Sequence, residues 1–326
     1  MHAIRIHETG GPEKLRQEDI SLPAPGAGEV RIRIEAAGVN YIDTYQRAGL
    51  YPVPLPHTLG LEAAGAVTAI GAGTEGFCLG DRVASAKVAG AYAAEALVSA
   101  AQLVRVPDGV ETRTAAALLL QGMTAHYLAC ATFPLKSGDT ALVHAAAGGV
   151  GLLLVQIAKL RGARVVATVG TDEKAKLARA AGADEICIYT REDFTAAARK
   201  FTGGRGVDVV YDAVGKDTFA GSIDSLRPRG TMVTFGNSSG PVPAFAPLLL
   251  SQKGSLFITR PTLAHYTATA QELQARAGEL FAWVKAGKLN VRIGATFPLA
   301  QAAEAHRALE GRKTTGKVLL VPSGEK

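Results

Sequence analysis

The sequence predicts an α/β protein in which a doubly wound parallel sheet is joined to a mostly β domain. Two observations predict this fold class. From Thr140 onward, strand-like and helix-like segments alternate with short connections, as in a parallel sheet covered by helices. In the first 110 residues, short segments of alternating apolar and polar residues are separated by Gly, Pro and polar turns, as in antiparallel sheets. A chain of 326 residues with 48% apolar residues is long enough for about two such domains.

The predicted β domain begins with the chain. Its strands are expected where apolar residues recur at every second position, because one face of each strand then points into a core. The 22-residue run Thr114–Leu135 lacks Asp, Glu, Lys and Arg but contains Gln121 and Pro134, so we interpret it as a buried helix rather than a membrane span. The expected strands are Ala3–His7, Val30–Ala36, Ala64–Ile70, Asp81–Ala86 and Tyr92–Val98.

The parallel sheet is expected to be complete at about Ile258. The later segments, a helix at Ala268–Ala286 and a strand, helix and strand within Ala295–Val321, are therefore expected to return to the first domain. The expected strands of the parallel sheet are Thr140–His144, Arg164–Thr168, Glu185–Ile188, Val207–Asp212, Thr231–Phe235 and Ser255–Ile258. The helices expected between them are Val150–Leu160, Glu173–Ala181, Glu192–Lys200, Thr218–Leu226 and Ala246–Leu250.

The turn after the first of these strands is typical of dinucleotide-binding proteins. It follows the G-x-G-x-x-G spacing with Ala146 in the first glycine place. Gly148 is expected to let the backbone approach a pyrophosphate, and Gly151 to let helix and strand pack closely. The helix expected to begin at Val150 points unpaired N–H groups and the positive end of its dipole at that pyrophosphate. A dinucleotide is therefore the predicted ligand.

The composition argues against several other classes of protein. The formal net charge is +6, but there is no Lys/Arg-rich run and no basic stripe with interleaved aromatics, so nothing supports nucleic-acid binding. The cysteines, Cys78, Cys130 and Cys187, fit neither a disulfide framework nor a metal cluster. The opening residues lack the basic-then-apolar layout of a signal peptide. We therefore expect a cytoplasmic protein that does not enter a membrane.

Motifs that are together specific for one subfamily lie along essentially the whole chain. They are AAGVNYIDTYQRAGLYP at 36–52, GLEAAG at 60–65, GDRV at 80–83, HAAAGGVG at 144–151, VGTDEK at 169–174, VVYDAVG at 209–215, FGNSSG at 235–240 and QKGSLFITRP at 252–261. With them the sequence resembles the medium-chain dehydrogenases/reductases, specifically the zinc-free NADPH:quinone oxidoreductases of the zeta-crystallin type. The resemblance implies a Rossmann domain at 123–261 that binds NADPH, and a discontinuous GroES-like domain at 1–122 and 262–326.

The chain departs from the zinc-dependent alcohol dehydrogenases of the same superfamily. Those enzymes place a cysteine where this chain has Asn40 and a histidine where it has Leu61. Glu62 remains, but one carboxylate beside a leucine does not make a tetrahedral zinc site. The four closely spaced cysteines of the superfamily's structural zinc lobe are also missing, and the seven histidines form no HxxxH pair. We therefore expect no metal.

The resemblance also assigns the candidate site residues. The cleft that receives the acceptor is expected to be lined by the candidate catalytic residues Asn40, Asp43, Tyr45 and Tyr51. The candidate cofactor residues are Asn40, Ile42, Tyr45 and Thr124 near the nicotinamide half, Ala147, Gly148, Gly149 and Val150 at the pyrophosphate, Phe235, Gly236, Asn237 and Ser238 at the end of the fifth strand, and Gly170, Lys174, Tyr189 and Arg312 near the adenosine phosphate.

The end of the second strand favours NADPH over NADH. NAD-specific folds place Asp or Glu there, where it binds the ribose 2′-OH and repels a 2′-phosphate. This chain has Val169, Gly170 and Thr171 instead. Thr171 is expected to be a helix N-cap, which puts Asp172 and Glu173 in the first turn, where the helix dipole favours acids.

The resemblance implies hydride transfer from NADPH to a quinone. Hydride addition leaves a delocalised hydroquinone anion that solvent can protonate, so the protein has to hold nicotinamide and acceptor face to face without a Lewis acid. An NADPH-dependent reductase of activated C=C bonds is the alternative, with Tyr51 as candidate acid. The resemblance also permits an RNA-binding or structural, crystallin-like role without turnover. The apolar edge GSLFIT at 254–259 predicts a homodimer, since two such edges hide each other by pairing.

Overall fold

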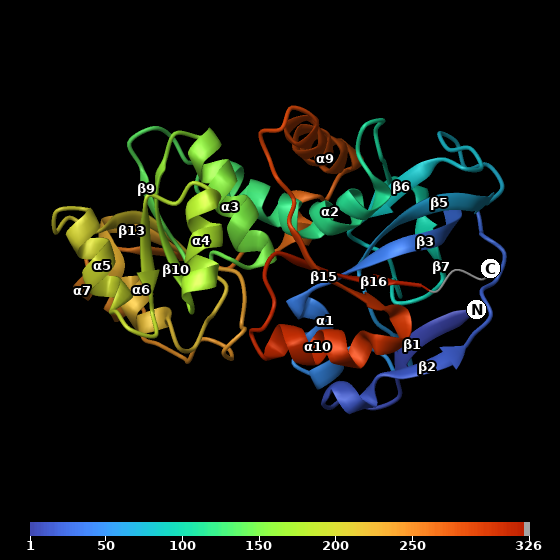
Figure 1. The fold of residues 1–326 in the computed structure, drawn as a ribbon, viewed down its shortest axis with the longest axis horizontal. Helices are drawn as coiled ribbons and strands as arrows, with labels where there is room; N and C mark the ends of the chain where they lie inside the picture. Colours follow the sequence, from blue (N-terminus) through green and yellow to red (C-terminus); the bar gives the residue numbers. More distant parts are fainter. Residues whose placement is uncertain (323–326) are drawn as a thin grey trace. The chain divides into compact units, whose positions relative to one another are not determined.

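The structure, a computed structural model, describes residues 1–322 and separates into two compact units (Figure 1). Among the described residues, the first unit contains Met1–Leu120, Ala268–Gly287 and residues 291–322, and the second contains Gln121–Thr267 and Lys288–Asn290. The β domain is therefore built from both ends of the chain, as predicted. The residue boundaries that the sequence suggests for the domains stay predictions.

The strands of the first unit form two sheets within residues 1–322. The smaller sheet contains β1 (His2–Ile6), β2 (Arg16–Asp19) and β4 (His57–Thr58), in the order β2-β1-β4. The larger sheet contains β3 (Glu29–Val39), β5 (Glu62–Ile70), β6 (Arg82–Ser85), β7 (Glu95–Ser99), β8 (Val104–Arg105), β15 (Ile293–Pro298) and β16 (Lys317–Val321). Its order is β15-β16-β3-β5-β6-β8, and β7 also pairs with β3. Val30, Ile32 and Ile34 alternate into the core of this unit, as the period of two predicts.

The helices of the first unit include one that the sequence did not predict. It is α1 (Tyr41–Ala48), which follows β3 after the N-cap Asn40. The helix is ended by the C-cap Gly49, whose φ of 84° is readily adopted by glycine but rarely by other residue types. The others are α9 (Ala270–Lys285) and α10 (Ala302–Glu310), with single turns at Pro12–Lys14, Ala100–Gln102 and Leu299–Gln301.

The C-terminal strand lies at the centre of the first unit. Figure 1 shows the red β16 beside the blue β3, and the two run antiparallel with Val318 opposite Val39 and Leu319 opposite Gly38. Lys317 therefore comes next to the point where β3 ends and α1 begins. The predicted return of the tail to the first domain is confirmed.

The second unit is the predicted doubly wound sheet. All its strand pairs are parallel, in the order β11-β10-β9-β12-β13-β14. The strands are β9 (Thr140–Val143), β10 (Arg164–Val169), β11 (Glu185–Ile188), β12 (Val207–Asp212), β13 (Leu226–Thr234) and β14 (Phe257–Thr259). The helices are α3 (Gly149–Leu160), α4 (Asp172–Ala180), α5 (Phe194–Phe201), α6 (Phe219–Ser225), α7 (Leu248–Gln252) and α8 (Leu263–Tyr266). Right-handed crossovers put α3 and α4 on one face and α5 and α6 on the other (Figure 1).

The uncharged run that superficially resembled a membrane span is mostly α2 (Thr112–Tyr127), followed by a π-helical turn at Leu128–Thr132. Most of its apolar residues are buried, including Leu118 and Leu119. Within the described residues, no helix combines the length and the apolar character needed to cross a bilayer.

The predicted element boundaries differ from the structure where tertiary contacts intervene. The segment predicted as one strand, Tyr92–Val98, first bridges β1 at Ala93 and joins β3 only from Glu95, because it passes from one sheet to the other. The helix predicted to begin at Val150 begins one residue earlier. The strand predicted to start at Thr231 starts at Leu226, since the pairing with β12 begins there.

Candidate active site and cofactor site

The predicted catalytic residues gather on α1 and the turn that follows it. Asn40 is the N-cap, and its backbone N–H donates to Asp43 Oδ2 at 2.8 Å, so the third residue of the helix caps its own first turn. Tyr45 and Tyr51 lie edge to face with ring centroids 5.3 Å apart, and the Tyr51 N–H donates to the Tyr45 carbonyl. The structure thus brings together Asn40, Asp43, Tyr45 and Tyr51 within one unit, whereas their roles stay predictions.

A buried lysine that the sequence reasoning missed meets Asn40. Lys317, only 1% exposed, donates to Asn40 Oδ1 at 2.8 Å and forms an ion pair with the fully buried Glu62. The Asn40 amide donates in turn to Glu62 Oε2 at 3.0 Å and to the Gly38 carbonyl at 3.1 Å. Burial lowers the pKa of Lys317, while the negative charge of Glu62 opposes this shift. The sequence signal was a lone lysine at the head of an apolar strand, but its partners lie more than 250 positions away.

This donor set does not fit a zinc ion. The Lys317 ammonium already lies against both Asn40 Oδ1 and Glu62 Oε2, so a dication bound to these oxygens would meet a like charge. The other Glu62 oxygen accepts the Leu120 N–H at 2.7 Å. In residues 1–322 no group of three His, Cys, Asp or Glu side chains is arranged to hold a metal. We therefore derive no chemistry through zinc at this position.

A second buried network starts at Asp43. The Tyr92 hydroxyl donates to Asp43 Oδ2 at 2.9 Å and lies 3.1 Å from His306 Nε2, and Arg47 lies 3.0 Å from His306 Nδ1. Arg47 also pairs with Glu310 at 2.7 Å. Burial raises the pKa of Asp43 to about 7, against the hydrogen bonds from Asn40 and Tyr92. Burial, together with the charge of Arg47, lowers the pKa of His306 to about 3.

The glycines of the dinucleotide turn are required for different reasons. A Cβ added to Gly151 would overlap the carbonyl oxygen of Ala145 and lie 2.7 Å from Ala146 Cα, so close packing of helix and strand needs glycine here, as predicted. A Cβ on Gly149 would overlap the Gln121 side chain. On Gly148 it would approach only the Ala145 carbonyl, at 3.2 Å, which leaves its other sides open. This open backbone at the start of α3 fits a pyrophosphate.

The ends of β10 and β11 bring together the residues predicted for the adenosine phosphate. Thr171 caps α4 by accepting the Lys174 N–H at 3.3 Å, which confirms the expected N-cap. The Tyr189 N–H donates to the last residue of β10, and a Cβ on Gly170 would lie 2.8 Å from the Tyr189 hydroxyl. Gly170, Lys174 and Tyr189 thus surround one strand end.

Asp172, the acid closest to this strand end, is held by an arginine that the sequence reasoning did not single out. Arg191 binds both carboxylate oxygens of Asp172, at 2.6 and 3.1 Å. Hydrogen bonding to Arg191 lowers the pKa of Asp172. The carboxylate is therefore paired with a cation next to the strand end.

Arg260 organises the turn after β13. It donates to the Thr234 hydroxyl at 3.1 Å and to the Gly236 carbonyl at 3.0 Å, and in the amide orientation that satisfies both partners it also binds Asn237 at 3.0 Å. The Ser238 N–H donates to the Ala213 carbonyl. The predicted segment Phe235–Ser238 is thus fixed at the carboxyl edge of the sheet, where open α/β sheets bind ligands.

The remaining predicted cofactor residues lie apart from these clusters in the sequence. Thr124 is buried in α2 of the second unit. Arg312 is exposed after α10 in the first unit and has a φ of 56°, which is uncommon for a residue other than glycine. Their contacts with a cofactor stay predictions.

Comparison with known proteins gives one consistent answer. Residues 26–108 match the family described as "Alcohol dehydrogenase GroES-like domain", and residues 149–280 match "Zinc-binding dehydrogenase". A quinone oxidoreductase of Pseudomonas aeruginosa is 48% identical over 98% of this chain and 99% of that protein. The solved structure of Escherichia coli quinone oxidoreductase complexed with NADPH matches with a TM-score of 0.97 and 43% identity, covering 99% of this chain and all of that one. This chain belongs to the zinc-free quinone oxidoreductase family.

Membership of the quinone oxidoreductase family confirms the resemblance seen in the sequence and the predicted fold class. The family includes relatives with other names. A 2-haloacrylate reductase of a Burkholderia species is 44% identical over 98% of this chain and 98% of that protein. The family therefore leaves more than one class of acceptor to consider.

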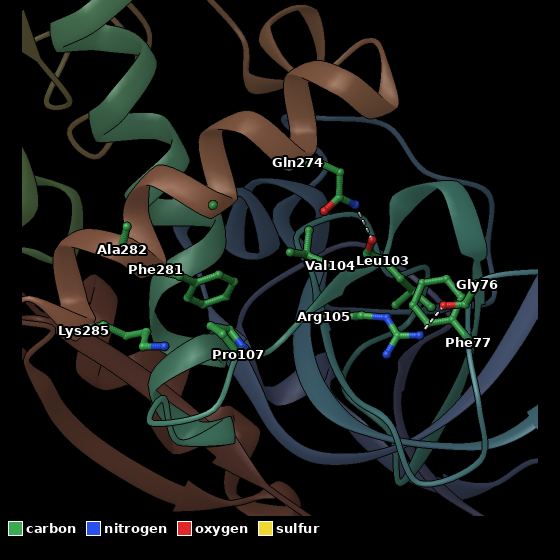
Figure 2. A pocket seen from close by; sticks show the side chains of 11 residues that line it. Gly76, Phe77, Leu103, Val104, Arg105, Pro107, Gln274, Phe281, Ala282 and Lys285 are labelled. Atoms are coloured by element: carbon green, nitrogen blue, oxygen red, sulfur yellow. Dashed lines mark hydrogen bonds between the residues drawn. The ribbon is translucent and has the colours of Figure 1, made fainter.

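One cavity of the first unit is lined by none of the predicted site residues. Figure 2 shows it in the first unit, where Phe281 of α9 faces Pro107 and Val104. Its volume is about 510 Å³, and none of the predicted catalytic or cofactor residues lines it. The Gln274 amide donates to the Leu103 carbonyl at 2.9 Å, which ties α9 to this part of the β domain.

Proposed function

We propose that this chain is an NADPH-dependent quinone oxidoreductase that transfers hydride to a quinone without zinc. The observation that carries this proposal is the similarity, over 99% of the chain at 43% identity and a TM-score of 0.97, to a quinone oxidoreductase solved with NADPH. A second solved relative, mycobacterial Rv1454c complexed with NADPH, is 48% identical with a TM-score of 0.96. The Asn40, Glu62 and Lys317 cluster supports the zinc-free part of the proposal.

NADPH would bind along the carboxyl edge of the parallel sheet. The N–H groups at the start of α3 would hold its pyrophosphate, since Gly148 leaves the backbone open there. Lys174 and Tyr189 would hold the 2′-phosphate. Arg191 would add a positive charge nearby, and its ion pair with Asp172 would keep that carboxylate from repelling the phosphate. The turn at Phe235–Ser238, fixed by Arg260, would support the middle of the molecule.

The chemistry asked of the protein is mainly orientation. Bound NADPH supplies the hydride. Asn40, Tyr45 and Tyr51 would hold the acceptor against the nicotinamide, and one ring of the edge-to-face tyrosine pair would offer its face to a flat quinone. The Lys317 and Glu62 pair would fix the Asn40 amide, whose two N–H groups are both directed at protein oxygens.

The second candidate function is reduction of activated C=C bonds, which the 2-haloacrylate reductase relative favours. Such a reaction needs a proton delivered to carbon, for which Tyr51 is the candidate acid. Tyr51→Phe should therefore reduce enone or haloacrylate turnover by roughly 10²–10⁴ if this function holds, and should leave quinone turnover within a few-fold of the parent. Equal losses with both substrate classes would contradict the assignment of Tyr51 as acid.

A steady-state screen tests the proposed function directly. NADPH and NADH are each combined with ortho-quinones, para-quinones, enones and 2-haloacrylates, and cofactor oxidation is followed. We expect the highest kcat/KM with NADPH and a quinone. The proposal is overturned if no quinone is reduced, or if NADH is the better donor for every acceptor.

We also propose that the protein is a cytoplasmic homodimer.

A further inference from the structure

In the network at Asp43, the residue types determine which group donates and which accepts in each hydrogen bond. Arg47 carries only donors, so His306 Nδ1 must accept from it. Because the pKa of His306 is about 3, the ring is neutral at pH 7 and carries its single N–H on Nε2. That N–H donates to the Tyr92 oxygen, and Tyr92 then uses its own hydrogen to donate to Asp43.

Both hydrogen bonds that Asp43 accepts in this network are made to the same carboxylate oxygen. Asp43 Oδ2 accepts from the Tyr92 hydroxyl and from the Asn40 N–H. Oδ1 is buried and has no hydrogen-bond partner in the described part of the chain. A carboxylate oxygen without a donor is costly to bury, whereas a protonated oxygen at the same place removes the charge.

We propose that Asp43 carries a proton on Oδ1 and supplies it to the reduced acceptor, and that Tyr92 and His306 are positioning residues that leave only this oxygen for the proton. The supply role rests on the proposed function. Hydride addition makes the quinone an anion. The O–H bond of Asp43 then breaks, its proton passes by way of a water molecule to the anion, a product O–H bond forms, and the carboxylate takes a new proton from solvent. One proton is consumed for each hydride, as quinone reduction requires.

The charges around Asp43 are compatible with this proton near neutral pH. Arg47 on the same helix pairs with Glu310 of α10, and Lys317 of β16 pairs with Glu62 of β5, so both cations are balanced without Asp43. Tyr92 faces Asp43 from the segment before β7, and His306 of α10 is neutral. The pKa of Asp43, raised by burial to about 7, fits a group that both gives and regains a proton at this pH.

Infrared difference spectroscopy tests the protonation without turnover. Spectra of the whole protein are recorded at about pH 5 and about pH 9, for the parent and for Asp43→Asn, because the acid is expected to lose its proton between these values. We expect a protonated-carboxyl C=O band that disappears at high pH, shifts in D₂O and is missing in Asp43→Asn. If parent and variant give the same spectrum in this region, Asp43 is not a protonated acid and the proposal is wrong.

The pH profile of kcat tests the positioning residues. In the parent, quinone turnover should fall as the pH rises through about 7. Tyr92→Phe removes a donor to the Asp43 carboxylate and so raises the pKa of Asp43. The falling limb of the profile, where kcat drops with rising pH, should therefore move to higher pH by about one to two units. Tyr211→Phe is the matched control, because Tyr211 is equally buried and donates its hydroxyl to the carbonyls of Leu128 and Phe133 in the second unit, outside the Asp43 network.

Two variants at His306 distinguish a role through its hydrogen bond to Tyr92 from a role in packing alone. In His306→Gln, the amide can still donate to Tyr92, and the limb should stay within a few tenths of a pH unit of the parent. In His306→Leu, the donor to Tyr92 is lost while Tyr92 can still donate to Asp43, so the falling limb should move to higher pH, but by less than in Tyr92→Phe. Limbs that coincide in all these variants would overturn the positioning role. Failure of the parent to reduce any quinone would overturn the proposed function, and the infrared band would still report on Asp43.

Discussion

At the scale of single residues, the most informative position is the buried Lys317. Its ammonium lies against Asn40 and Glu62, and the resemblance places Asn40 where the zinc enzymes of this superfamily have a cysteine ligand. A buried ion pair adds little net stability compared with apolar residues, but loss of one partner leaves the other charge buried and unpaired. The buried Glu62 therefore requires a cation beside it.

Lys317→Met should destabilise the protein strongly. Breaking a buried pair costs about 3–5 kcal/mol, which lowers Tm by roughly 10 °C in a unit of this size. Lys313→Met, at an exposed position, is the control and should change Tm little. Differential scanning calorimetry measures both, and a Lys317→Met protein as stable as the control would contradict the buried ion pair.

Lys174→Ala should weaken NADPH binding selectively. A hydrogen bond to a charged group contributes about 1.5–3 kcal/mol, so KM for NADPH should rise roughly 10- to 150-fold with kcat little changed. KM for NADH should stay nearly constant because NADH has no 2′-phosphate. Lys176→Ala on the same helix is the control. If the ratio of kcat/KM for NADPH and NADH does not fall in Lys174→Ala alone, the 2′-phosphate is bound elsewhere.

At the scale of elements, the site depends on where helices begin. Helix α1 begins at Tyr41, after the N-cap Asn40, whose N–H donates to Asp43, and α3 begins at Gly149, after Gly148, whose carbonyl accepts the Leu152 N–H. Helix α1 follows β3 after the single residue Asn40, whereas α3 follows β9 after the glycine turn at 144–148. Each strand thus fixes the position of one helix N-terminus.

Gly151→Ala should disturb the junction of β9 and α3. The added methyl overlaps backbone, which cannot move aside as a flexible side chain can, and overpacking of this kind costs about 1–3 kcal/mol. Gly278→Ala in α9 is the opposite control, because an added Cβ there meets nothing within 4 Å and alanine favours a helix by about 0.5–1 kcal/mol. Thermal unfolding should show Tm falling in the first variant and rising in the second. A rise in both would refute the packing argument.

At the scale of the whole molecule, the open edge of the parallel sheet predicts association. Strand β14 ends the sheet order, and Phe257 on it is 61% exposed. Two copies that paired these edges would continue the sheet and cover both phenylalanines. The expected assembly is a homodimer.

Phe257→Lys should weaken this dimer, because it places like charges in the paired edges. We expect light scattering at micromolar concentration to give the mass of a dimer for the parent and of a monomer for the variant. Leu79→Lys, at a residue that is 68% exposed in the first unit, is the control and should remain a dimer. A monomeric parent would contradict the prediction.

Much of the fold was predictable because its signals are local. Alternation of period two marked the strands of the β domain, and the alternation of strand and helix marked the parallel sheet. Thr171 could be predicted as an N-cap from its residue type and from the acidic residues that follow it. Helix α1 was not predicted, because its eight residues are few and include two tyrosines and a threonine, which carry weak helical signals.

The sequence by itself determined the fold class, the glycine turn, the family and the residues of α1 that carry the resemblance. Each of these is encoded by residue type at short spacing. Only the tertiary structure placed Lys317 beside Asn40. It also joined Arg47, His306 and Tyr92 in a series of hydrogen bonds that ends with Tyr92 donating to one oxygen of Asp43. These contacts join residues separated by up to 277 positions, through the pairing of β16 with β3 and the packing of α10 near α1. No local pattern encodes such pairs, because their free energy comes from burial that exists only once the chain has folded.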